Sequence, residues 1–293
     1  MKKALTVIHI YYPEQTDLVL ELLDNISIPY DLYCTIGNSD KYDYIKQKIL
    51  EKQPNVNIIT TANVGYDVWP FIHVITSVDL SKYDYIIKIH TKRDVNEEYL
   101  FKIGNKFLFK PGSQWRNDLY EFLKTKDNFN KCLSALENPN IGMCTRFNLI
   151  HNKPNHCGVI DIAMEKWPKY LLDINDYSFV AGTMFIAKAK PFQIIKDMNI
   201  TEDLFEKPTQ NRKTQFAHLM ERMFGAIIYK SDMVIQDPFT SDKILNSINI
   251  RYKCFKILKD FVGYFVFFIP FPKVRRKLRN FLILHLCAWV IHI

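Results

Sequence analysis

The sequence predicts an α/β protein with a Rossmann-type, mostly parallel sheet that carries helices on both faces. The first 90 residues alternate short apolar runs with segments that repeat apolar residues at helical spacing, and such alternation produces a parallel sheet between two helical layers. The composition, 48% hydrophobic and 24% charged, supplies a sizeable core. Six scattered cysteines without a C-x-x-C pair predict free thiols in a reducing compartment, and argue against a disulfide framework or a Cys/His zinc site.

The N-terminal third is expected to contain four strands and three helices. The first apolar run, at residues 5–12, resembles a signal peptide only superficially, because His9 interrupts it and no small-residue cleavage site follows. We interpret it as the first strand of a cytosolic-facing protein. Further strands are expected at residues 30–37, 55–61 and 83–89, and helices at residues 15–26, 40–53 and 68–78.

The remainder of the chain is more mixed. We expect helices at residues 112–126 and 128–138, a short strand at 141–145, a loop at 148–158, a strand at 177–189 broken at Gly182, and a helix at 213–230 that runs into a short strand. The sequence changes character near residue 245. This change predicts a globular domain at residues 1–245 and a basic, amphipathic helical tail at residues 246–293.

The tail is both basic and apolar. Residues 251–293 contain nine Lys and Arg against one Asp, which accounts for the whole net charge of +8. Two apolar blocks, at 261–271 and 280–293, flank a basic stretch and are shorter than the roughly 20 residues that span a bilayer. This pattern is typical of a segment that lies on an anionic membrane surface; the alternative is a helix pair packed on the domain. No nucleic-acid partner is expected, because the rest of the chain is neutral and contains no recognised module.

A strongly polar cluster follows the fourth expected strand. The apolar run ends in Lys88, Ile89, His90, Thr91 and Lys92. A buried strand that stops there places these side chains at the carboxyl edge of the sheet, where open α/β sheets bind ligands. Two lysines, a histidine and a hydroxyl suit an anion, and phosphate above all. The alternative is a histidine satisfied at a strand end beside solvated lysines.

A second cluster lies just upstream, in the segment NVGYDVWPF at residues 63–71. Gly65 permits a positive φ or the close approach of a ligand to the backbone. Asp67 suits a sugar or ribose hydroxyl, or a metal ion. The alternative is a tight turn in which Asp67 caps the following helix.

Four segments, taken together, resemble the rhamnan synthesis protein F family, a group of bacterial cell-surface polysaccharide glycosyltransferases. They are NVGYDVWPF, IIKIHTKRD, VAGTMFIAK and AHLMERMFG, and the likeness runs from about residue 4 to residue 240. The chain departs from the family in the first segment, where Val64 and Tyr66 replace arginines. Direct arginine contacts to the donor diphosphate are therefore not expected there.

The resemblance implies a GT-A-like fold and a glycosyltransferase at the cytoplasmic face of the bacterial inner membrane, bound peripherally. It implies a nucleotide-sugar donor, with dTDP-rhamnose as the candidate, a lipid-linked glycan acceptor and an inverting single displacement. The alternative is a membrane-associated glycan- or nucleotide-binding protein without catalysis. A membrane scaffold without a small-molecule site is a third possibility.

The matching segments and the residue types together give the candidate site residues. For the donor these are Asn63, Gly65, Asp67, Lys88, His90, Thr91, Lys92 and Arg116, and for the sugar pocket Trp115, Gly182, Thr183 and Met184. Trp115 and Arg116 lie outside the matching segments and are candidates because an indole can stack on a sugar and a guanidinium can reach a phosphate. Trp115 and Arg116 are equally consistent with a helix anchor and a surface cation, and the break at Gly182 with a bulge.

Transfer to a hydroxyl needs a group that accepts its proton. Glu221 is the first candidate, Asp67 the second and His218 the third. His218, Glu221 and Arg222 share one helix face, so a local ion network is the alternative.

The metal requirement is open. Related folds hold Mg²⁺ or Mn²⁺ with an Asp-x-Asp motif after the fourth strand. Here His90, Thr91 and Lys92 take that place, with Asp94 two residues further on. Asp67, His90 and Asp94 are the candidate ligands, and a lysine is the alternative source of positive charge.

Overall fold

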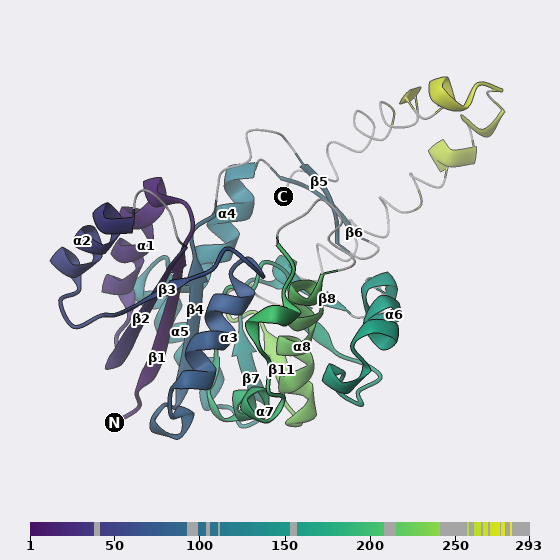
Figure 1. Ribbon diagram of the computed structural model, residues 1–293. Coiled ribbons are helices and arrows are strands. Elements are labelled where there is room, and N and C mark those ends of the chain that lie inside the picture. Colours follow the sequence, from purple (N-terminus) through teal and green to yellow (C-terminus); the bar gives the residue numbers. More distant parts are fainter. Residues whose placement is uncertain are drawn as a thin grey trace.

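The computed structural model describes most of the chain up to residue 240 and parts of the tail (Figure 1). The described residues are 1–37, 42–92, 99–103, 106–110, 112–152, 157–207 and 215–240, and in the tail 257, 261–264, 266–268, 270–275, 277–278 and 282.

Seven strands form the main sheet, in the order β3-β2-β1-β4-β10-β7-β11. Their bounds are β1 Ala4–Ile10, β2 Tyr30–Gly37, β3 Asn57–Thr61, β4 Tyr85–His90, β7 Ile141–Cys144, β10 Phe185–Lys188 and β11 Val234–Gln236. All neighbouring pairs in this sheet are parallel except the two that β10 makes, with β4 and β7. The predicted α/β class with a mostly parallel sheet is confirmed.

The connections place helices on both faces of the sheet. From β1 the chain passes outward to β2 and β3, and then returns to put β4 on the other side of β1. Right-handed crossovers put the helices of the outward and return steps on opposite faces. Accordingly α1 (Thr16–Leu22) and α2 (Tyr42–Lys52) pack together on one face, and α3 (Val68–Ser77) covers the other with α7 (Ile194–Asp197) and α8 (Phe216–Lys230) (Figure 1).

An aromatic cluster fills the space between α3, β10 and α8. The rings of Phe71, Phe185, Phe192 and Phe224 lie 5.3 to 6.2 Å apart, mostly edge to face, and all four are buried. Phe71 lies on α3 and Phe224 on α8, both in segments predicted as helices. This cluster packs beside β4, because Phe185 is the register partner of Lys88.

Helix α8 packs closely on strand β9 (Ser178–Val180) because Gly225 has no side chain. A Cβ at Gly225 would lie 2.1 Å from the carbonyl oxygen of Ser178 and 2.6 Å from Cα of Phe179. Strand β9 pairs in turn with β8 (Ile150–Asn152), within the stretch predicted as a loop. The loop prediction is therefore wrong for those three residues.

The other elements are α4 (Gly112–Tyr120), α5 (Lys126–Glu137), α6 (Cys157–Lys166) and an antiparallel hairpin of β5 (Tyr99–Ile103) and β6 (Lys106–Lys110). The sequence pattern predicted neither this hairpin nor α6, whose first two residues also fall in the predicted loop. Helix α5 begins two residues earlier than predicted, because the Thr125 hydroxyl caps it by accepting the N–H of Asn128 at 3.1 Å.

The tail exposes apolar side chains. Ile257, Phe261, Tyr264, Phe267, Phe268, Phe271 and Val274 are all more than half exposed, whereas Val262 and Val266 are buried. Among the residues that the structure describes, every helix falls short of the length and apolarity needed to cross a membrane. The predicted boundary near residue 245 lies outside the described residues.

Candidate active site

A cavity of about 260 Å³ opens at the carboxyl ends of β1 and β4. Its described lining is His9, Tyr11, Tyr12, Asn63, Tyr66, Asp67, His90, Thr91 and Lys92. His9 and His90 are register partners on the two strands. The chain leaves β1 in one direction and places β4 on its other side, so the cavity lies where the strand order reverses. That is the position at which open α/β sheets bind ligands.

A turn with two left-handed residues delivers Asp67 to this cavity. Gly65 has φ +63° and Tyr66 has φ +56°. A Cβ at Gly65 would lie 2.4 Å from the Phe205 ring, so only glycine fits. Asp67 then occupies the N-cap position of α3, but its side chain makes no capping bond. Of the alternative interpretation, the tight turn is present but the side-chain cap is not, and the carboxylate bonds to Lys88 on β4 instead.

Asp67, Lys88 and Thr183 form a buried cluster beside the cavity. The Lys88 ammonium donates to Oδ2 of Asp67 at 2.5 Å and to the hydroxyl of Thr183 at 2.7 Å. The Thr183 hydroxyl donates to the same Oδ2. Burial acts to raise the pKa of Asp67, but His90 and Lys88 hold it well below its usual range. Burial lowers the pKa of Lys88 while Asp67 opposes the shift; the short contact favours a charged pair at neutral pH.

A strained turn between β9 and β10 places Thr183. Gly182 has φ +83° and Thr183 has φ +52°, an unusual conformation for a β-branched residue. A Cβ at Gly182 would lie 2.7 Å from Leu119. The next residue, Met184, is wholly buried. Of the predicted sugar-pocket residues, the structure thus brings Gly182 and Thr183 to the cluster and places Met184 in the core instead.

Both ring nitrogens of His90 lie near backbone carbonyl oxygens. Nε2 lies 2.9 Å from the carbonyl of Gly182, and Nδ1 lies 3.0 Å from the carbonyl of Thr91. Burial lowers the pKa of His90, against the charge of Asp67. The ring therefore lines the cavity, and the nitrogen that carries the proton donates to one of these two carbonyls.

Thr91 and Lys92 differ in whether the side chain is engaged by the protein itself. The Thr91 hydroxyl accepts the backbone N–H groups of Tyr11 and Tyr12, both at 2.9 Å, and so ties β1 to β4. The backbone N–H of Lys92 donates to Gln15. Within the described residues the Lys92 ammonium has no ion-pair partner, and it lines the cavity together with the exposed Asn63.

His9 is a cavity residue that the sequence analysis missed. The Thr35 hydroxyl donates to the carbonyl of Ile8 at 3.2 Å and lies 3.0 Å from Nδ1 of His9. Because the Thr35 hydroxyl has already donated its one proton, it must accept a hydrogen bond from Nδ1–H of His9. Nε2 of His9 is then unprotonated and can accept a hydrogen bond. Burial lowers the pKa of His9 to about 3, so the ring is neutral. A polar residue inside the first apolar run was the only signal for it.

Glu221 lies in a network behind the Gly182 turn. Its Oε1 accepts the N–H of Gly182 at 2.9 Å, and its Oε2 lies 3.3 Å from Arg222 and 3.6 Å from His218. Burial acts to raise its pKa, but the hydrogen bond from His218 and the charge of Arg222 lower it to about 2. Neither Glu221 nor His218 belongs to the cavity's described lining. The contacts of Glu221 are those of the alternative interpretation, a local ion network with His218 and Arg222.

Trp115 and Arg116, both on α4, are absent from the cavity's described lining. Trp115 packs against the core near the Gly182 turn, and its Cζ2 lies 3.5 Å from the position of a Cβ on Gly182. The structure therefore leaves this pair out of the cavity's described lining, with Trp115 beside the Gly182 turn.

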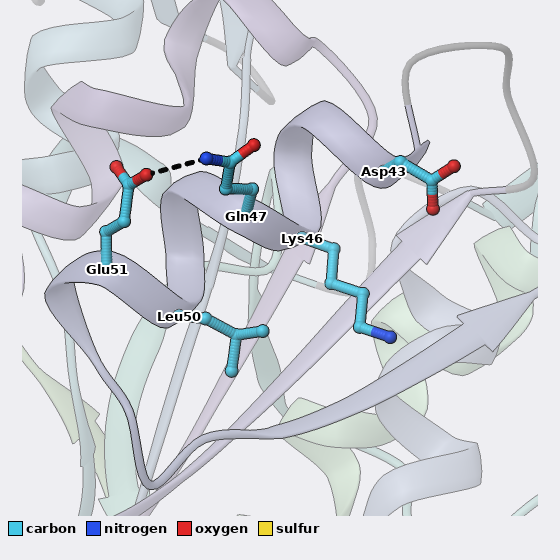
Figure 2. Close-up of a pocket in the computed structure, with 5 residues that line it drawn as sticks. All are labelled: Asp43, Lys46, Gln47, Leu50 and Glu51. Carbon is cyan, nitrogen blue, oxygen red and sulfur yellow. Dashed lines mark hydrogen bonds between the residues drawn. The ribbon is translucent and has the colours of Figure 1, made fainter.

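A wider hollow, of about 500 Å³, lies over α2 (Figure 2). It is lined by Asp43, Lys46, Gln47, Leu50 and Glu51, all exposed and all from one helix. It gathers no residue from the sheet edge, so it is not the candidate site.

The described residues do not fit a divalent metal site at the cavity. Lys88 and Thr183 already donate to Oδ2 of Asp67, and both nitrogens of His90 face carbonyl oxygens. Asp94 lies outside the described residues. In the part of the chain that the structure describes, no three His, Cys, Asp or Glu residues gather as metal ligands do.

Comparison with known proteins shows what this chain resembles. A curated relative, the uncharacterized protein WxcX of Xanthomonas campestris pv. campestris (strain B100), is 20% identical over 233 residues, which are 78% of this chain and 32% of that protein. Among solved structures, TarS of S. aureus gives a TM-score of 0.43 at 11% identity, over 83% of this chain and 35% of that chain. TarS 1–349 in complex with UDP gives 0.40 at 10% identity, over 97% and 72%.

The chain thus spans about a third of the length of WxcX and of TarS. The model of one family, described as rhamnan synthesis protein F, matches residues 1–233. Since that match covers most of the chain, the protein belongs to the rhamnan synthesis protein F family.

Proposed function

We propose that the protein is a glycosyltransferase that moves a sugar from a nucleotide-sugar donor to a cell-surface polysaccharide. Family membership supports the reaction class. The observation that carries the proposal is the cavity at the β1–β4 switch point, which is lined by both an ammonium group and a carboxylate, from Lys92 and Asp67. Transfer from a nucleotide sugar needs both a cation for the departing diphosphate and a base for the acceptor hydroxyl.

Lys92 is the residue proposed to hold the diphosphate. It lines the cavity, and no described acidic group neutralises it. Lys88, by contrast, is 1% exposed and already paired with Asp67. The positive charge that replaces a metal ion therefore comes from Lys92 in this proposal.

Asp67 is the proposed base. Of the three candidates, only Asp67 lines the cavity, and geometry is the first criterion for a general base. The acceptor hydroxyl gives its proton to Oδ1 of Asp67, and the oxygen attacks the anomeric carbon. The bond from that carbon to the diphosphate oxygen breaks, and its electron pair leaves with the diphosphate, beside Lys92. One displacement inverts the configuration.

The finer assignments follow the family. We propose dTDP-rhamnose as donor and a lipid-linked glycan as acceptor, at the cytoplasmic face of the inner membrane. The tail supports this placement, because its exposed aromatic residues are followed in the chain by the cations Lys273, Arg275 and Lys277. Aromatic side chains and cations together bind anionic lipid surfaces.

The proposal is tested with a panel of nucleotide sugars and a glycan acceptor, with release of nucleoside diphosphate as the readout. We expect turnover of one donor that persists in EDTA, since no described site fits a metal. Lys92→Met should lower turnover at least about tenfold, the value of one charged hydrogen bond. The matched control is Lys46→Met, which removes an exposed cation from α2 (Figure 2) and should leave turnover unchanged.

Two results would contradict the proposal. Binding of a nucleoside diphosphate without turnover of any donor would favour a non-catalytic binding protein. Turnover abolished by EDTA and restored by Mn²⁺ would show that a metal, rather than Lys92, carries the diphosphate.

A further inference from the structure

Lys88 is buried against Asp67, the proposed base, and its role rests on the proposed function. Its ammonium is enclosed by Asp67, Thr183 and the face of the Phe71 ring, whose centroid lies 5.3 Å away. The whole residue is 1% exposed and is absent from the cavity's described lining. A ligand in the cavity therefore meets Asp67 before it meets Lys88.

Thr183 completes the same arrangement from another element. Its hydroxyl accepts from Lys88 and donates to Oδ2 of Asp67, so it satisfies both partners. The residue adopts a left-handed conformation that costs a β-branched side chain energy. Strain of this kind persists only where the surroundings impose it, here the turn that begins at Gly182 and the bonds of the cluster.

The two donors fix one oxygen of Asp67 and leave the other open. Both bind Oδ2. In the described part of the chain no hydrogen bond uses Oδ1, and the carboxylate side chain remains 18% exposed, at the cavity. With Oδ2 held from two directions, rotation of the carboxylate is restricted, and Oδ1 is left without a described hydrogen bond for use by a ligand.

We infer that Lys88 and Thr183 are positioning residues that hold Asp67 with Oδ1 toward the acceptor hydroxyl, and that Lys88 is not a ligand of the diphosphate. This assignment changes the role of Lys88 from a donor-binding residue to a buried counter-charge. Lys88 and His90 lie on the same strand, yet only His90 lines the cavity, which agrees with separate roles for the two residues.

Thr183 gives the first test. Thr183→Val removes the hydroxyl at nearly constant shape, and Thr183→Ser restores it. We expect Val to lower kcat about tenfold, the value of one hydrogen bond to a charged group, and Ser to recover most of the loss. The affinity for UDP or dTDP, measured by titration calorimetry, should stay the same in both variants.

Lys88 gives the second test, through pH. Asp67 faces Lys88 and His90 on β4, His9 on β1 and Lys92 beyond β4. Lys88→Met removes the closest cation, so burial should raise the pKa of Asp67 and an acid-side inflection should enter the pH profile of kcat. The carboxyl ¹³C resonance of Asp67, identified by its loss in Asp67→Asn, reports the same ionisation without turnover.

Because Lys88→Met leaves a buried carboxylate unpaired, that variant can fail to fold. The double variant Lys88→Met/Asp67→Asn removes both charges and should bind UDP or dTDP as tightly as Asp67→Asn alone. Binding weaker by about tenfold or more in the double variant would make Lys88 a diphosphate ligand and overturn the inference. An Asp67 resonance that titrates alike with and without Lys88 would also overturn it. If the wild type transfers no sugar, the proposed function fails, and the resonance still decides whether Lys88 controls Asp67.

Discussion

At the scale of single residues, His9 makes a prediction about pH. Its pKa falls from the ordinary 6.5 to about 3 because the ring is buried. Between those values the unfolded chain binds a proton that the folded protein does not, so stability is highest above pH 6.5 and falls as the pH drops toward 3. The slope contributed is up to about 1.4 kcal/mol per pH unit. Urea unfolding of His9→Gln, followed from neutral to mildly acidic pH, should show that part of the slope removed.

The control for His9 is His73→Gln, which changes a half-buried histidine on α3 that packs against Trp69. His73 lies outside the cavity's described lining, so this variant shows the general cost of a His→Gln substitution. Equal slopes in the wild type and in His9→Gln would show that His9 is not buried as the structure describes.

The residues of the candidate site were predictable in part. Polar side chains at the end of an apolar strand indicated the region of His90 and Lys92, and both line the cavity. The sequence could not show which polar side chain faces the cavity. Lys88 and Lys92 look alike in the sequence pattern, yet Lys88 is buried and Lys92 lines the cavity. Part of that difference comes from Thr183, which is 95 residues away from Lys88 in the sequence.

At the scale of elements, Gly225 joins α8 to β9. A methyl group there would lie 2.1 Å from a backbone oxygen of Ser178, which has no flexible side chain to move aside. We expect Gly225→Ala to lower the free energy of unfolding by about 3 kcal/mol, the upper range for overpacking, despite the better helix propensity of alanine. Chemical denaturation measures the loss. Gly263→Ala is the matched control, because a Cβ at that glycine has no atom within 4 Å; an equal effect of the two substitutions would contradict the packing argument.

Elements with strong apolar runs were predicted within a few residues. Strands β1 to β4 are rich in Ile, Val and Tyr, and each appears in the sheet near its predicted place. Strand β8 was missed because it has only three residues and a mixed pattern, and it is a strand through its pairing with β9 rather than through its own composition. Tertiary pairing of this kind is invisible in a local window.

For the whole molecule, strand order was the part that sequence could not supply. Alternating strands and helices predicted that the first four strands join one mostly parallel sheet, but not their order, β3-β2-β1-β4. Strand β10, however, enters antiparallel between β4 and β7, although it is far from β4 in the sequence. This insertion brings the Gly182 turn, and hence Thr183, to the end of β4. The site therefore depends on a long-range pairing and not on any one motif.

The tail makes the last prediction, about the molecule as a whole. Phe267, Phe268 and Phe271 are exposed, and Lys273, Arg275 and Lys277 follow them in the chain. If these cations engage anionic lipid at about 1 kcal/mol each, replacing all three with alanine should weaken binding to vesicles of mixed phosphatidylglycerol and phosphatidylcholine by roughly a hundredfold. Vesicle sedimentation measures this binding, and raised salt should weaken the binding of the wild-type protein as well.

The phenylalanines are tested separately. Phe267→Ser/Phe268→Ser should weaken binding to both anionic and neutral vesicles, since this variant removes apolar area rather than charge. A tail that packs on the domain instead would leave vesicle binding unchanged in both variants, and would lower the unfolding temperature of the phenylalanine variant.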